Sequence, residues 1–221
     1  MRTRTKVALG GVIGTLSLVG AAAVATATVS AIVARTVITP PSRREEDVAV
    51  ISVDLDASLV VLESTADSRL PGEYSFWFSR ESGHARLGEI IAQTPDTVTR
   101  RILAVDLGDF RAAKRGRLTG WFYLTPVDLG VPFEDVAIET SLGDAPAWLI
   151  PPASGEPGET WAIHVHGRAV RRPETLRAVP IFREAGYTSL VVSYRNDGEA
   201  PRSDDHRYAL GDREWLDVDA A

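Results

Sequence analysis

Two short apolar runs joined by a predicted helix constrain the fold of this 221-residue chain more than any other feature. Trp161–Val165 and Thr188–Tyr194 have the length and composition of buried parallel strands. Residues 173–185 between them have helical spacing of apolar residues, a proline in the first turn and Gly186 at the end. Pro180 should kink this helix or divide it. The sequence therefore predicts a strand, a crossover helix and a parallel strand.

A hairpin is predicted just before this unit. Phe133–Ser141 and Ala147–Pro151 have strand character, and the Gly143-Asp144 pair between them suits a turn. Residues 211–221 begin an amphipathic helix. We therefore predict a second domain over residues 127–221.

The N-terminal segment predicts targeting to a membrane. Residues 7–34 carry no charge and follow three basic residues, and their length exceeds the ~20 residues that a spanning helix needs. Residues 1–35 are therefore expected to form a signal-anchor or a signal peptide, with the lipid bilayer as partner of residues 7–34. The expected location is the cell membrane, single-pass, with the C-terminal bulk outside the cytoplasm. Cleavage of the signal and secretion is the alternative.

A linker and a small β module follow. Residues 36–47 combine prolines with charges, which is typical of a linker. Residues 48–126 are expected to form a small, mostly antiparallel β-rich module, with strands at 48–53, 58–63, 74–78, 97–105 and 120–124. His84 stands in a glycine-flanked stretch and is interpreted as a turn residue with a structural or surface role.

Composition excludes several classes of function. The chain has no cysteine, so disulfides, thiolate catalysis and iron-sulfur clusters are excluded. A net charge of -6 argues against a nucleic-acid binder. No cofactor and no metal is predicted. Only Lys6 and Lys114 are lysines, and the excess of arginine is interpreted as a consequence of genome composition.

The segment after the first parallel strand carries the strongest functional signal. His166-Gly167-Arg168, the predicted helix, and then Ser189–Gly198 resemble the third strand, first helix and fourth strand of α/β-hydrolases. The resemblance implies an α/β fold: an incomplete α/β-hydrolase sheet preceded by a transmembrane helix and a small β-rich module. It is closest to bacterial, N-terminally anchored members of that family.

The resemblance also implies an activity and a site. In that family the loop after this strand supplies an N–H of the oxyanion hole, which places this role on His166, Gly167 and Arg168. The implied function is hydrolysis of a small-molecule or peptide ester or amide by acyl transfer to serine. The nucleophile, acid and histidine of the family are absent from the 221 residues. We therefore expect the chain alone to be inactive.

Two other functions stay open. His164 and His166 form an H-x-H pair on one strand face, a geometry that metal-dependent hydrolases use for zinc. The other alternative is a non-catalytic envelope binding protein, a pseudoenzyme. Arg195, Asn196 and Asp197 at a strand end are candidates for a pocket rim, with a turn as the alternative role.

Overall fold

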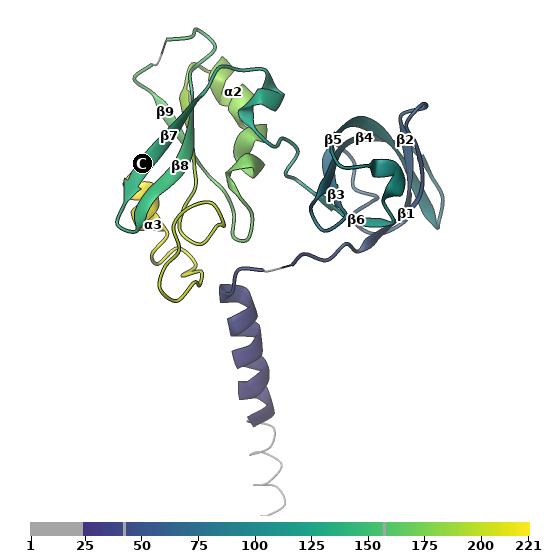
Figure 1. The fold of residues 1–221 in the computed structure, drawn as a ribbon, viewed down its shortest axis with the longest axis horizontal. Helices are drawn as coiled ribbons and strands as arrows, with labels where there is room; N and C mark the ends of the chain where they lie inside the picture. The colour runs from purple at the N-terminus through teal and green to yellow at the C-terminus, as the bar shows by residue number, and fades with distance from the viewer. Residues whose placement is uncertain (1–23, 42, 157) are drawn as a thin grey trace, which may run out of the picture.

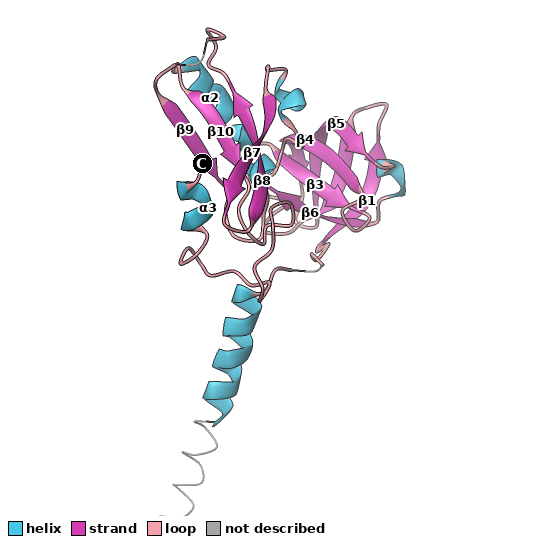
Figure 2. Cartoon of the chain, turned by 60° about the vertical axis from the view of Figure 1, so that its left-hand side comes forward, coloured by secondary structure: helices cyan, strands magenta, loops and turns pink. Residues whose placement is uncertain are grey.

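The computed structural model describes residues 24–41, 43–156 and 158–221. Residues 24–38 are helical and lead through a linker into two β units that lie side by side (Figures 1 and 2). The first unit is a closed barrel and the second is a four-stranded sheet. The C-terminal part of the chain returns to the end of the helix, where the amide of Tyr208 donates to the carbonyl of Ile38 at 2.8 Å.

Six antiparallel strands close the barrel. They follow the order β1-β2-β5-β4-β3-β6, and β6 pairs again with β1. Register shifts along β4 and β5 bend these long strands, which is how a small sheet closes on itself. The strands are β1 (Val48–Asp54), β2 (Leu59–Glu63), β3 (Tyr74–Phe78), β4 (Gly83–Gln93), β5 (Thr97–Leu107) and β6 (Arg115–Thr119).

Aromatic rings fill the barrel core. Phe76 and Phe78 point inward from β3 and contact Phe110 of the short helix η1 (Phe110–Ala112), with ring centroids 5.7 and 5.0 Å apart. A Cβ on Gly116 would lie 2.3 Å from the Phe76 ring, so the ring rests directly on the glycine backbone. The rings of Phe76 and Phe78 both belong to the core cluster of the barrel.

A buried arginine fastens the loop between β2 and β3. Arg100 is fully buried and its guanidinium has no carboxylate partner among the described residues. It donates instead to the carbonyls of Gly88, Ser68 and Leu70 at 2.8 to 3.2 Å, and to that of Gly72. Because Arg100 donates to three carbonyls between β2 and β3 and to one of β4, it ties the loop to the barrel.

The second unit is a mixed sheet of order β7-β8-β10-β9. Strands β9 and β10 are parallel, as the sequence predicted, and the remaining pairs are antiparallel. The divided helix between them packs on one face, where Leu176 and Val179 contact Trp148 and Val191. The elements are η2 (Pro126–Leu129), β7 (Glu134–Thr140), β8 (Gly143–Ile150), β9 (Trp161–Val165), η3 (Arg172–Arg177), α2 (Val179–Glu184) and β10 (Thr188–Val192).

The C-terminal helix α3 (Trp215–Asp219) is fixed to the end of β10 by a buried ion pair. Oδ2 of Asp217 accepts from both the backbone amide and Nε of Arg195, at 2.8 and 2.9 Å. A charged pair with extra hydrogen bonds tolerates burial because its polar atoms keep partners. Arg195 is therefore a structural residue and not part of a pocket rim.

The predicted strands of the barrel need two corrections. Residues 120–124 are not a strand, because the strand that closes the barrel is β6, which precedes them. The predicted turn around His84 is part of β4. His84 is fully buried there, with Nδ1 2.9 Å from Asp106, so its role is structural and not that of a surface residue.

The predicted fold class is wrong. The described chain is mostly β, with a six-stranded closed barrel, a second sheet and short helices, and not an α/β-hydrolase sheet behind a transmembrane helix. The parallel pattern that suggested an α/β protein is real but confined, among the described residues, to the pair β9 and β10. The barrel strands are antiparallel and need no crossover helices.

The predicted single-pass membrane location is also corrected. Residues 7–23 of the predicted span lie outside the described residues. Among the residues that the structure describes, no helix has both the length and the apolar character that crossing a bilayer requires.

Candidate functional site

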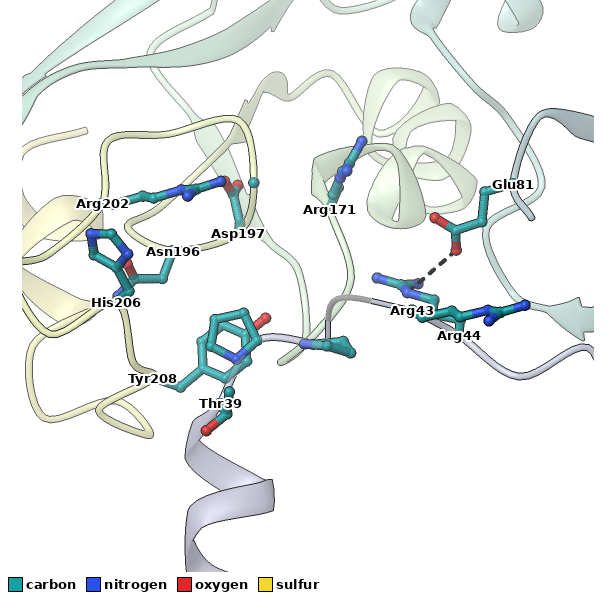
Figure 3. A pocket seen from close by; sticks show the side chains of 13 residues that line it. Thr39, Arg43, Arg44, Glu81, Arg171, Asn196, Asp197, Arg202, His206 and Tyr208 are labelled. Atoms are coloured by element: carbon teal, nitrogen blue, oxygen red, sulfur yellow. Dashed lines mark ion pairs between the residues drawn. The ribbon is translucent and has the colours of Figure 1, made fainter.

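A pocket of about 470 Å³ lies where the linker, the barrel and the loops of the second sheet meet (Figure 3). Four arginines face two carboxylates in its lining. It is defined by Thr39, Pro40, Pro41, Arg43, Arg44, Glu81, Arg171, Asn196, Asp197, Gly198, Arg202, His206 and Tyr208, and is called the arginine pocket below.

Arg44 joins three parts of the chain at this pocket. Its guanidinium donates to the carbonyl of Ala169 after β9 and lies 3.5 Å from Glu81 of the barrel. Burial, and after it the nearby charges of Arg117 and Arg171, lowers the pKa of Arg44. Because burial and these neighbouring charges all disfavour the charged form of the guanidinium, a bound anion would stabilise it.

Three of the lining arginines have no carboxylate partner. Among the described residues, no ion pair joins the guanidinium of Arg43, Arg171 or Arg202 to an acidic side chain. Arg171 lies over the ring of Trp121 and against Gly198, where an added Cβ would stand 3.4 Å from its Nε. Gly198 thus leaves room for the guanidinium beside the loop backbone.

The loop after β10 is held in shape by Asn196. Asn196 adopts a left-handed conformation, with φ at 68°, which asparagine tolerates better than most residues. Its amide nitrogen donates to Ser203 Oγ at 2.8 Å and to the carbonyl of Arg207 at 2.7 Å. These hydrogen bonds therefore hold the loop that carries Arg202 and His206 in shape without a ligand.

Asp197 closes the same loop with its carboxylate. Oδ1 accepts from the amides of Glu199 and Ala200, both at 2.8 Å, and Oδ2 lies 3.2 Å from Nε2 of His166. Burial alone would raise the pKa of Asp197, but the hydrogen bonds from His166 and the two amides hold it below its usual value. The carboxylate is therefore ionised at neutral pH and satisfied internally.

The predicted oxyanion-hole residues lie next to this pocket. His166 is buried, stacks on Tyr194 with ring centroids 4.2 Å apart, and has Nδ1 2.9 Å from the carbonyl of Gly167. That carbonyl also accepts from the hydroxyl of Tyr194 at 3.1 Å. Arg168 points to the N-terminal helix and donates to the carbonyl of Val37. His166 and Gly167 therefore contact each other and Tyr194, whereas Arg168 contacts the N-terminal helix.

His164 and His166 make separate contacts. Nε2 of His164 lies 3.0 Å from Oγ of Ser189, and its ring packs edge-on against Phe182. His166 bonds with Asp197 instead. In the part of the chain that the structure describes, no three histidine, aspartate or glutamate side chains gather as a metal site would require.

The barrel is the part of the chain that comparisons with known proteins recognise. A family model described as a domain of unknown function, DUF8805, matches residues 49–119. The match begins in β1 and ends with β6, so it covers the closed barrel and leaves out most of the residues that line the arginine pocket. No curated protein and no solved structure matches the chain.

The resemblance to α/β-hydrolases is therefore wrong. The family model that matches residues 49–119 is DUF8805, and the described fold is mostly β with few helices. His-Gly-Arg after a parallel strand is a three-residue pattern that also fits a tight turn, so it does not specify a family. The hydrolytic activity that rested on the resemblance stays a prediction from the sequence.

Sequence reasoning found part of the arginine pocket. Asn196 and Asp197 were candidates for a pocket rim and do line it. Arg43, Arg44 and Arg171 were missed, because they were interpreted as linker charges or as a consequence of composition. The available signal was the occurrence of adjacent arginines at Arg43-Arg44 and at Arg171-Arg172.

Proposed function

We propose that this chain is a binding protein for a small molecule that carries a carboxylate or phosphate group, and that the arginine pocket is its site. The proposal is supported by one observation above all. Guanidinium groups from the linker, from the loop after β9 and from the loop after β10 line a single cavity without carboxylate partners among the described residues.

Arginine suits this role because its planar fork presents two N–H donors to the two oxygens of a carboxylate or phosphate. The cavity volume lies within the range typical of small-molecule sites. The loops are held by internal hydrogen bonds, so little ordering would oppose binding. Asp197 and Glu81 are already paired, which leaves the free arginines to the ligand.

The test is a calorimetric titration of the full chain with phosphate, pyrophosphate and citrate at low salt. Arg171→Gln and Arg202→Gln each remove one guanidinium that has no ion-pair partner among the described residues. We expect each to weaken binding at least tenfold, about 1.4 kcal/mol. Binding should also weaken as ionic strength rises, because exposed parts of the site are screened.

Arg111→Gln is the matched control. Arg111 is exposed on the barrel, 3.8 Å from Asp56, and does not line the pocket. Equal affinity in the wild type and this control, with loss in the two pocket variants, supports the proposal. The absence of binding for all three anions, or equal loss in control and pocket variants, would overturn it.

A further inference from the structure

A second pocket lies against the arginine pocket and differs from it in character. Its volume is about 330 Å³ and its lining is mainly apolar. It is defined by Val165, His166, Arg168, Tyr194, Tyr208, Leu210, Gly211, Glu214, Trp215 and Val218, and is called the apolar pocket below.

The polar groups in this lining are used within the protein. The carboxylate of Glu214 accepts from the amides of Ala209 and Gly211 at 2.7 and 2.8 Å. The hydroxyl of Tyr194 donates to backbone carbonyls. Because these atoms have partners, the surface that remains for a ligand is the carbon of Leu210, Trp215 and their neighbours.

Two links connect the pockets. Tyr208 lines both of them. His166 lines the apolar pocket, Asp197 lines the arginine pocket, and the two side chains are hydrogen-bonded to each other. The two pockets therefore adjoin each other at Tyr208 and at the His166–Asp197 pair.

Exposure of large apolar side chains supports a binding role for this region. Leu210 is 60% exposed and Trp215 is 54% exposed, on either side of a short loop. A ligand that covered them would remove apolar surface from water, which is favourable in proportion to the area covered.

We infer that the ligand is a monomeric amphiphilic anion, whose carboxylate or phosphate binds in the arginine pocket and whose alkyl or aryl group lies in the apolar pocket. This inference rests on the proposed function, and adds the chemical class of the ligand. Charge complementarity selects the head group, and the adjacent apolar surface selects the tail.

The experiment uses n-alkyl phosphates from methyl to octyl, each below its micelle concentration, titrated into the full chain. Affinity should rise with each added methylene by about twofold to fourfold until the apolar pocket is filled. Leu210→Ser and Trp215→Ser should reduce the gain in affinity from chain length. Ile181→Ser is the matched control, because Ile181 is 70% exposed on α2 and lines neither pocket.

A second measurement locates the tail directly. An alkyl phosphate with a terminal diazirine is photolysed on the protein, and the labelled peptide is identified by mass spectrometry. Labelling within residues 208–218 supports the inference. Labelling confined to other segments overturns it.

The outcomes separate this inference from the function on which it rests. If methyl phosphate does not bind, or Arg171→Gln leaves its binding intact, the proposed function fails. If methyl phosphate binds through Arg171 but octyl phosphate binds no more tightly, only the inference about the tail fails. Binding to phosphatidylcholine vesicles containing phosphatidic acid, without binding to monomers, also overturns the inference, since it would identify a lipid surface instead.

Discussion

Nε2 of His166 lies 3.2 Å from Oδ2 of Asp197, and the pair joins the strand end after β9 to the loop after β10. Both side chains are buried, and each faces a different pocket. This hydrogen bond and the contacts of Tyr194 with His166 and Gly167 together hold the two loops that build the candidate site. We therefore expect loss of the hydrogen bond to lower stability as well as binding.

Asp197→Asn tests this hydrogen bond. The variant keeps an oxygen for the loop amides but loses the negative charge that strengthens the hydrogen bonds to Asp197, so we expect unfolding free energy at pH 7 to fall by about 1–3 kcal/mol. The lowered pKa of Asp197 fixes the pH window. Its contribution is fully present above the unfolded pKa of about 3.9 and is lost as pH falls through the folded pKa.

Urea denaturation of both proteins at pH 7 and pH 5 checks this prediction. The difference in unfolding free energy should be the same at the two values. A difference that shrinks at pH 5 would contradict it. Asp204→Asn, at an exposed position in the same loop, is the control and should behave as the wild type.

Two buried histidines predict a loss of stability in mild acid. Burial lowers the pKa of His164, and burial lowers that of His84 despite the opposing hydrogen bond that its ring donates to Asp106. Each neutral histidine contributes stability that is fully present above the unfolded pKa of about 6.5 and is lost as pH falls through its folded pKa. The slope should reach at most about 1.4 kcal/mol per pH unit for each group.

The measurement is the unfolding free energy of the full chain between pH 8 and pH 5. His164→Gln removes one of the two groups, so its profile should be flatter than that of the wild type below pH 6.5. An unchanged slope would show that His164 does not titrate differently in the folded and unfolded states.

Gly116→Ala should destabilise the barrel. The added methyl group would meet the Phe76 ring at 2.3 Å and the carbonyl oxygen of Trp77 at 2.5 Å, and the backbone cannot move aside easily. We expect a loss of about 1–3 kcal/mol in thermal or chemical unfolding, as overpacked cores show. Gly120→Ala is the control, since its nearest neighbour is a terminal nitrogen of Arg177 at 3.7 Å. Equal stability of the two variants would contradict the close packing.

Arg100→Leu should lower the free energy of unfolding by more than the loss of an exposed charge would. The substitution leaves the carbonyls of the loop between β2 and β3 without donors, and we expect a loss of about 3 kcal/mol or more. The adjacent Arg101→Leu is the matched control, because Arg101 is exposed and pairs with an exposed glutamate. Proteolysis within residues 64–73 should rise in Arg100→Leu and remain at the wild-type level in Arg101→Leu.

The strands and helices in which apolar residues recur at a regular spacing were predictable from the sequence. The strand of Trp161–Val165 was found with the bounds of β9, and Pro180 does divide the predicted helix, into η3 and α2. The strand β4 was missed because glycine and histidine at its start resemble a turn. Its place in the sheet depends on pairing with β3 and β5, which is tertiary information that local sequence does not contain.

The candidate site was harder to predict than the fold. Asn196 and Asp197 could be located because they follow directly on a predicted strand. Arg44 and Arg171 are 127 residues apart and meet because the linker and the loop after β9 line the same pocket. Nothing in the local sequence of either arginine indicates the other.

The closed barrel has a consequence for how this chain can associate. Each of its six strands already has two neighbours, so another polypeptide cannot extend it by adding a strand. The second sheet keeps β7 and β9 as open borders, and β9 presents Trp161, Ile163 and Val165 to solvent. Association by strand pairing would therefore start from the second sheet. The barrel would be carried along in such an assembly without contributing a strand to it.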